Sequence, residues 1–194
     1  MCIRDSILTV SGTPLLFYFD NNHTSLSTIS IILFSFGLFL VYSSSSAYHF
    51  VINSTLKKRL RILDHISIYY LILGSYAPVC FITLYDYSGI NIFIAVFTLS
   101  VIGTLKKFFF TGRFQILSLV LYLLMGWLIV FEIKLLFELL DSKAELLLII
   151  GGLSYTVGII FYALDKIKYF HSVWHLFVLT GSISHYLMVL LYII

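Results

Sequence analysis

The sequence predicts an all-α integral membrane protein built as a bundle of seven transmembrane helices. Of its 194 residues, 60% are hydrophobic and only 11% are charged, and the mean hydropathy is +1.04. A soluble domain has about 25% charged residues. The apolar residues are also grouped in long blocks, most of them near the roughly 20 residues that a helix needs to cross a bilayer. We therefore expect one transmembrane domain over residues 1–194.

The start of the chain differs from the rest. Residues 1–6 form a polar hexapeptide that resembles adapter-derived sequence, and we expect it to be non-native. Residues 7–19 are apolar but too few to cross a hydrocarbon core. A signal peptide would need a basic stretch leading into a continuous apolar segment and a small-residue cleavage site, and neither is found. We therefore expect residues 7–19 to be the remnant of a first helix that is truncated at its N-terminus.

Six further apolar blocks follow in order, separated by short polar turns. We expect the spans at about 28–50, 64–84, 90–105, 114–131 or slightly beyond, 146–164 and 169–194. Pro78 lies inside the third span and is expected to kink it. Gly151, Gly152 and Gly158 in the sixth span are small residues that let helices approach closely.

Charged residues alternate between the two sides of this bundle. Three loops carry most of the basic residues, namely Lys57, Lys58, Arg59, Arg61, Lys106, Lys107, Arg113, Lys166 and Lys168. The other connections carry Asp20, Asp86, Glu138, Asp141 and Glu145, with only Lys143 positive. Because basic loops stay in the cytoplasm, the N-terminus is predicted to be cytoplasmic and Ile194 external. The net charge of +3 is too small to indicate a nucleic-acid partner, and the two cysteines indicate neither a disulfide framework nor a thiolate metal site.

Polar residues from three separate spans fall at one predicted depth, near the cytoplasmic boundary. His49 ends the second span, and Ser45 lies one turn deeper on the same face. Asp64 begins the third span, while His171 and His175 project from one face of the seventh. Imidazoles are costly inside a bilayer unless they have a partner. The three spans are therefore expected to bring these residues together in a functional site.

Three imidazoles with a carboxylate nearby are the residue types of a catalytic zinc site. Zinc is bound tetrahedrally, leaving one position for a water whose pKa falls to about 7. We predict that His49, His171 and His175 bind Zn²⁺. Asp64 would orient or deprotonate the water, and Ser45 would hydrogen-bond a ligand, the water or a substrate oxygen. No glutamate follows His171, so the zincin motif, which also uses a histidine pair four residues apart, is absent.

Asp64 and Ser45 each have a simpler interpretation, and the histidine cluster has an alternative ligand. Asp64 is also placed to pair with Arg61 or to cap the third span, and Ser45 is one of four consecutive serines that can satisfy backbone groups. Haem held between His49 and a histidine of the seventh span is an alternative to zinc, but it leaves Asp64 and a third histidine unused. Because no lysine follows Lys168, the seventh span offers no attachment point for retinal.

The remaining histidines are expected outside the ligand set. His65 points about 100° away from Asp64 on a helix, which favours packing or support of a ligand. His185 lies roughly 15 Å deeper along the seventh span and is expected to hydrogen-bond another helix. His23 is expected to be a solvated loop residue.

The same residues carry a family resemblance. The motifs are Ser45-x-x-x-His49, Leu60-Arg61-x-Leu63-Asp64-His65-x-x-Ile68-Tyr69, Gly74-Ser75-Tyr76-x-Pro78, Tyr122-x-x-Met125-Gly126-Trp127, Gly151-Gly152-x-x-Tyr155-x-x-Gly158 and His171-x-x-Trp174-His175-Leu176-Phe177-Val178-Leu179. In this order they resemble the hemolysin III family, which is related to the progestin and adipoQ receptors and more distantly to alkaline ceramidases. The match covers the second to seventh spans and departs from the family pattern at the incomplete first helix.

The resemblance implies a seven-helix bundle with zinc near its cytoplasmic side. It implies His49, His171 and His175 as ligands, with Asp64 near the metal-bound water and Ser45 beside it. Eukaryotic relatives are linked to ceramide amide hydrolysis, whereas the bacterial members were named for a cytolytic, pore-like activity.

Two functions follow as expectations. The first is a zinc-dependent hydrolase of the bacterial inner membrane, acting on an amide or ester lipid that enters laterally from the bilayer. The alternative is a membrane-perturbing or pore-forming cytolysin, or a regulator of membrane lipids, in which zinc is structural. Membrane lipids are the expected partners in each case, and the oligomeric state is left open.

Overall fold

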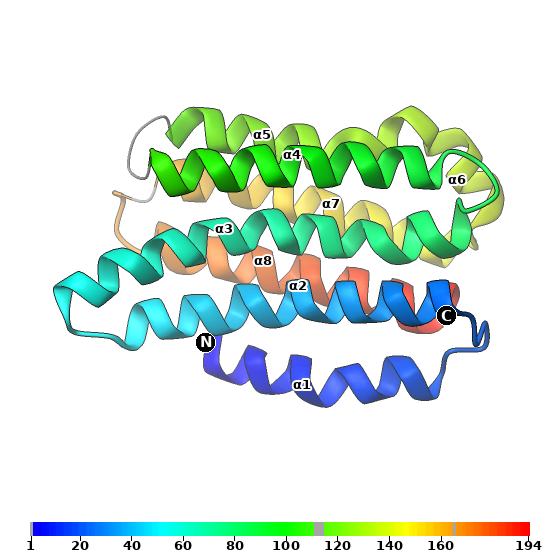
Figure 1. Ribbon diagram of the computed structural model, residues 1–194, viewed down its shortest axis with the longest axis horizontal. Helices are drawn as coiled ribbons and strands as arrows, with labels where there is room; N and C mark the ends of the chain where they lie inside the picture. Colours follow the sequence, from blue (N-terminus) through cyan, green and yellow to red (C-terminus); the bar gives the residue numbers. More distant parts are fainter. Residues whose placement is uncertain (1, 111–114, 165) are drawn as a thin grey trace.

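The computed structural model describes residues 2–110, 115–164 and 166–194, and these residues form helices and turns with no β-strand (Figure 1). The α-helices are α1 (Cys2–Tyr18), α2 (Ser25–Phe50), α3 (Ser54–Pro78), α4 (Gly89–Phe109), α5 (Gln115–Trp127), α6 (Ile133–Leu139), α7 (Ser142–Ala163) and α8 (Phe170–Met188). Residues 1, 111–114 and 165 lie outside the described part of the chain, and with them the predicted start of the fifth span at Phe114 and one basic loop residue, Arg113.

Three short segments of other helical types extend these helices. A π-helix (Val79–Thr83) continues α3, a 3₁₀-helix (Leu128–Glu132) joins α5 to α6, and a second π-helix (Val189–Ile193) continues α8. The first of them begins directly after Pro78, where the sequence predicted a kink. A proline cannot donate the backbone hydrogen bond that a regular α-helix requires.

Six helices of the described chain are long and apolar enough to cross a membrane. They are Ser25–Phe50, Ser54–Thr83, Gly89–Phe109, Gln115–Leu139, Ser142–Ala163 and Phe170–Ile193. The prediction of an all-α integral membrane protein is thereby confirmed. Helix α1 has 17 residues and packs against α2, and its place as a seventh span stays a prediction.

The helices lie alongside one another in a bundle. In Figure 1, α1 lies beside α2 at one edge, and α4 and α5 lie at the opposite edge. Helix α2 packs most extensively on α3, and α7 on α8. Helix α3 also contacts α4 and α5. The bundle thus contains two closely packed helix pairs, α2–α3 and α7–α8.

Two glycines allow the close approach of α2 and α3. A Cβ atom on Gly37 would lie 2.6 Å from the carbonyl oxygen of Tyr70, and one on Gly74 would lie 2.6 Å from that of Leu33. Each glycine therefore faces the backbone of the other helix. Without a side chain at these positions the two backbones can approach closely, as is common between membrane helices.

The replacement Gly74→Ala is expected to destabilise the protein by about 1–3 kcal/mol, because the added methyl group forces two tightly packed backbones apart. Thermal unfolding in detergent measures the change. Gly152→Ala is the matched control, since a Cβ there meets no atom within 4 Å and alanine favours a helix over glycine by up to about 1 kcal/mol. Equal destabilisation by both replacements would contradict the role given to Gly74.

Helix α3 begins earlier than the hydropathy pattern predicts. The segment 53–61 was expected to be a loop, but the helix starts at Ser54, about ten residues before Asp64. The side chain of Asn53 caps it by accepting hydrogen bonds from the backbone N–H groups of Thr55 and Leu56, each at 3.0 Å. Lysine, arginine and leucine are good helix formers, so the basic residues extend the helix beyond its apolar part.

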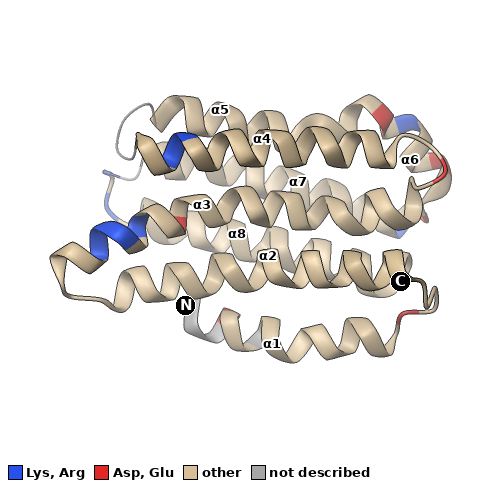
Figure 2. Cartoon of the chain, viewed as in Figure 1, with Lys and Arg blue, Asp and Glu red and all other residues tan. Residues whose placement is uncertain are grey.

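The charges separate toward the two ends of the bundle. Figure 2 shows Lys and Arg at the start of α3, near the end of α4 and in the connection from α7 to α8, which all lie at one end. We call this the basic end. Acidic residues lie mainly at the opposite end, in the connections around α1–α2, α3–α4 and α6–α7. This separation follows the predicted alternation of loops, and the orientation of the basic end in the membrane stays a prediction.

Candidate metal centre

Three histidines from two helices meet at the basic end. His49 lies in the last turn of α2, and His171 and His175 lie in the first turns of α8. The Nε2 atom of His171 is 3.3 Å from Nε2 of His49 and 3.1 Å from Nε2 of His175. The three residues each offer a ring nitrogen, all within 4.8 Å of one another. The structure therefore brings together the three histidines that the sequence proposed as ligands.

The local structure explains this arrangement. Residues four apart on a helix lie one above the other, so His171 and His175 share one face of α8. Tyr169, with a left-handed backbone (φ 72°), precedes the helix, and its carbonyl oxygen accepts a hydrogen bond from Val173 N–H at 3.0 Å. His49 is exposed, whereas the two histidines of α8 are partly buried.

The spacing of the nitrogen atoms suits a small cation. Ligands at about 2.0–2.1 Å from a tetrahedral zinc ion lie about 3.3 Å from one another, close to the two Nε2–Nε2 distances given above. Three histidines at that spacing can supply three of four ligands. The geometry and the donor type thus fit a metal ion with an open position.

Asp64 and Ser45 form a second polar pair beside the histidines. Their side chains are hydrogen-bonded to each other, joining α3 to α2. Ser45 is buried at 4% exposure. Both residues border the same cavity as His171 and His175. The simpler interpretations of Asp64 are wrong: it lies well inside α3 rather than at its cap, and its partner is Ser45 rather than Arg61.

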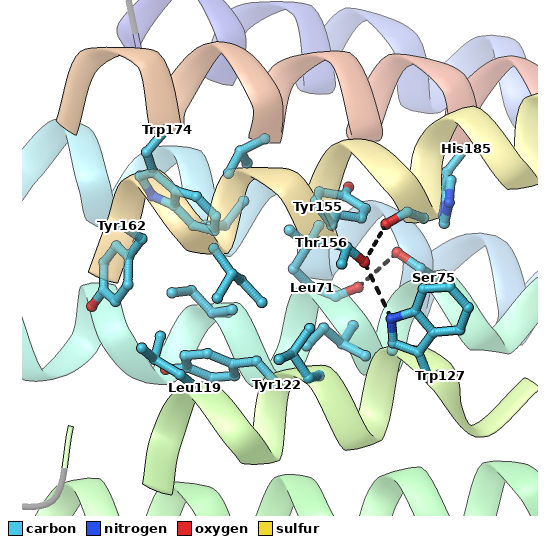
Figure 3. A pocket seen from close by; sticks show the side chains of 18 of the residues that line it. Leu71, Ser75, Leu119, Tyr122, Trp127, Tyr155, Thr156, Tyr162, Trp174 and His185 are labelled. Carbon is cyan, nitrogen blue, oxygen red and sulfur yellow. Dashed lines mark hydrogen bonds between the residues drawn. The ribbon is translucent and has the colours of Figure 1, made fainter. Parts of the chain in front are cut away.

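A cavity of about 670 Å³ extends from these residues into the bundle, bordered by α2, α3, α5, α6, α7 and α8. Its volume lies in the range of about 300–1,000 Å³ typical of small-molecule sites. Figure 3 shows Tyr162, Tyr122 and Trp174 toward one end, and Trp127 and His185 toward the other. Most of the lining is apolar. Its charged residues, Arg61 and Asp64, lie at the basic end, whereas Ser75, Thr156 and His185 place polar groups toward the other end. Such a cavity can hold an apolar chain with its polar group near the histidines.

The side of the cavity between α5 and α7 is loosely closed. The indole Nε1–H of Trp127 donates a hydrogen bond to Oγ1 of Thr156 at 3.2 Å, which bridges the two helices (Figure 3). On either helix a neighbouring glycine, Gly126 or Gly152, borders the cavity, and a Cβ on either would meet nothing within 4 Å.

His65 lies on the wall of this cavity. Its ring contacts Tyr162 edge-on at 6.2 Å between centroids, and its carbonyl oxygen accepts a hydrogen bond from the Tyr122 hydroxyl at 2.8 Å. Residues of α5 and α7 therefore hold it in place. His65 thus packs against neighbouring helices, as predicted, and it also borders the cavity.

The prediction for His185 is wrong. Both of its ring nitrogens are buried and neither has a hydrogen-bond partner among the described residues. The ring lies against Gly151, where any side chain would overlap it, and edge-on to Tyr155 at 5.5 Å between centroids. The space left by a glycine, rather than a hydrogen bond, positions it. His23 is an exposed loop residue with φ 48°, as predicted.

From the sequence, Arg61 was assigned to the orientation of the helices and, as an alternative, to a pair with Asp64. In the structure it borders the cavity at the basic end, on the same helix as Asp64 and His65. The spacing of four residues between Arg61 and His65 places both on one helical face. That signal was present in the sequence, but it could be used only once this segment was recognised as helical.

Comparison with known proteins shows clear relatives. A family model described as "Haemolysin-III related" matches residues 6–186. "Hemolysin-3" of Bacillus cereus is 36% identical over 190 residues, covering 97% of this chain and 87% of that protein. The "Hemolysin-3 homolog" of Bacillus subtilis (strain 168) is 36% identical over 187 residues, with 96% and 88% covered. "Monocyte to macrophage differentiation factor" of Homo sapiens is 29% identical over 165 residues, with 79% and 66% covered. No solved structure gives a significant match.

Proposed function

Since the chain belongs to the haemolysin III family and is an integral protein of a bacterial membrane, we propose that it is a zinc-dependent hydrolase acting on an amide or ester lipid. One observation carries the proposal. The three histidines and the Asp64–Ser45 pair lie at the basic end of the bundle, where a mostly apolar cavity begins. A metal centre that only held helices together would not need a carboxylate and a ligand-sized cavity beside it.

Zinc is the metal that the donor set favours. Imidazole nitrogen suits zinc, copper, iron and nickel, and three protein ligands with one open position are typical of catalytic zinc. His49, His171 and His175 would hold the ion. When bound, zinc would polarise a carbonyl group and lower the pKa of a water molecule.

Side chains of the protein would position the water and the substrate and would accept the proton. Asp64 would orient the attacking water and accept its proton, a role that requires its carboxylate to lie within hydrogen-bond reach of that water. The Ser45 hydroxyl, which is hydrogen-bonded to Asp64, would fix the direction of that carboxylate. The apolar wall would bind the hydrocarbon part of the substrate and exclude bulk water. A lipid would enter between α5 and α7, where Gly126 and Gly152 leave space.

The location of the metal centre supports a cytoplasmic site. Lys and Arg gather at the same end of the bundle as the three histidines. Because basic segments favour the cytoplasmic side, the metal centre would face the cytoplasm and Ile194 the outside.

A second candidate function is membrane perturbation. The relative from Bacillus cereus is named Hemolysin-3, and in this chain a bound metal would join α2 to α8. With a purely structural metal, solute leakage from liposomes containing the protein would survive replacement of Asp64 while the metal stays bound.

The purified protein is expected to contain about one zinc ion per chain, measured by elemental analysis in detergent. Removing the metal with a chelator should lower the melting temperature, because an ion that binds only the folded state stabilises it by about 4 kcal/mol at a free concentration 1,000 times its Kd. Restoring zinc should restore the melting temperature. Protein that is metal-free and gains no stability on zinc titration would refute the proposed centre.

A further inference from the structure

One arginine and one histidine border the metal-centre end of the cavity, and we propose that they recognise an anionic phosphate headgroup on the lipid that the cavity binds. Arg61 and His65 border the cavity, and Lys107 is buried close to both. This headgroup site narrows the substrate class of the proposed function, and it rests on that function's lipid-binding cavity.

Arg61 and His65 both have free hydrogen-bonding capacity. The guanidinium group of Arg61 forms no ion pair with a described residue. In His65, Nδ1 is buried without a partner, while Nε2 is not buried and forms no hydrogen bond with a described residue. The two side chains are one helical turn apart on α3 and border the same space. Together they offer several donors to one ligand group.

Lys107 strengthens the positive potential at this point. It is only 4% exposed, in the last turn of α4, and it interacts electrostatically with both Arg61 and His65. Charges act more strongly in a poorly solvated site than in water. Lys107 is not among the described residues that border the cavity, and its charge favours an anion there only through its proximity to Arg61 and His65.

The opposing negative charge is small. Among the described residues that border the cavity, Asp64 alone is acidic, and its carboxylate is hydrogen-bonded to Ser45. Guanidinium groups bind phosphate oxygens through two parallel charge-assisted hydrogen bonds. A phosphate group on a lipid would therefore find Arg61 and His65 at the same end of the cavity as the metal centre.

Basic residues at this end of the bundle also serve to orient membrane helices, and the chain contains a control that separates the two roles. Arg59 lies on the same helix and is exposed, as Arg61 is, but unlike Arg61 it does not border the cavity. Loss of its charge weakens general attraction to anionic lipid as much as loss of the Arg61 charge does. Only Arg61 should affect a ligand inside the cavity.

The two tryptophans of the chain, Trp127 and Trp174, both border the cavity and give a direct readout. Trp174 is 8% exposed and Trp127 is 47% exposed. In a Trp127→Phe protein, fluorescence therefore reports Trp174 alone. The probes are lysophosphatidic acid and lysophosphatidylcholine with the same brominated acyl chain, added to protein in phosphatidylcholine nanodiscs. The bromine atoms quench the indole when the chain occupies the cavity.

Lysophosphatidic acid is expected to quench Trp174 at about a tenfold lower concentration than lysophosphatidylcholine, because hydrogen bonds between charged groups contribute at least about tenfold in affinity. In this background Arg61→Gln should remove the difference and Arg59→Gln should keep it. Inorganic phosphate at millimolar concentration should leave the quenching unchanged, since it has no chain.

Several results would overturn the inference. They are equal quenching by the two lipids in the Trp127→Phe protein, an equal effect of Arg59→Gln and Arg61→Gln, and displacement by inorganic phosphate, which would assign the site to free phosphate. If neither lipid quenches Trp174, the lipid-binding cavity fails and this inference with it. Preference for the anionic lipid in a protein that binds no zinc would instead refute the proposed hydrolase and leave the headgroup site standing.

Discussion

Replacing both His171 and His175 with alanine is expected to reduce bound zinc from about one ion per chain to background. The double change leaves His49 as the only histidine of the three that meet at the basic end. Removing even an outer partner of a metal ligand weakens binding about 10–100-fold, so loss of two direct ligands should have a larger effect. Elemental analysis after purification and zinc titration of the purified variant measure it.

His23→Ala is the matched control, because it removes an exposed imidazole far from the cluster in sequence. It should keep full zinc content. The melting temperature of the double variant without zinc should resemble that of chelator-treated wild-type protein, which separates loss of the metal from loss of the fold. Full zinc content in the double variant would place the metal elsewhere in the molecule.

The replacement Asp64→Asn is expected to lower lipid hydrolysis by about 10²–10⁴-fold while zinc content stays unchanged. A positioned general base contributes an effect of that size. Asparagine has nearly the same shape and its carbonyl oxygen can still accept a hydrogen bond from Ser45, but the amide cannot take up a proton. Release of fatty acid from a short-chain ceramide and from lysophosphatidic acid tests an amide and an ester substrate in parallel.

Asp86→Asn makes the same chemical change at an exposed turn outside the cavity lining and should leave the rate unchanged. If Asp64→Asn hydrolyses both lipids at the wild-type rate, Asp64 is not the base. If neither lipid is hydrolysed by wild-type protein and liposome leakage is the same in wild type and Asp64→Asn, the second candidate function is favoured.

The helices were predictable from the sequence because apolar blocks of about 20 residues are characteristic of membrane-spanning helices. The residues at which the helices begin and end were less predictable. The basic turns of α3 from Ser54 onward are helical, although hydropathy detects only the apolar part of a helix. The 3₁₀ segment Leu128–Glu132 also has no signal in composition, since such changes of helix type depend on neighbouring helices.

The meeting of His49 with His171 and His175 was predicted by the equal depth of these residues in two spans, and the structure shows the close approach of their nitrogens. Depth alone does not fix the rotation of a helix. For this reason the sequence left the partner of Asp64 open, and only helix packing shows that it is Ser45.

The cavity lay beyond sequence reasoning, because an enclosed space is defined by residues from six α-helices at once. Arg61 was therefore missed as a cavity residue. His185 was expected to find a hydrogen-bond partner because a buried imidazole usually has one. In the structure the ring of His185 occupies the space that a side chain at position 151 would fill. Gly151 lies on α7, so no sequence pattern within α8 predicts this contact.

The long separation between the metal-centre histidines along the chain has a consequence for assembly. His49 and His171 are 122 residues apart, so closing the loop between them costs about 4 kcal/mol in chain entropy. Helix packing offsets this cost only after α3 to α7 have packed and α8 has joined the bundle. A nascent chain would therefore acquire its metal last, and occupancy would distinguish fully assembled molecules from those still incomplete.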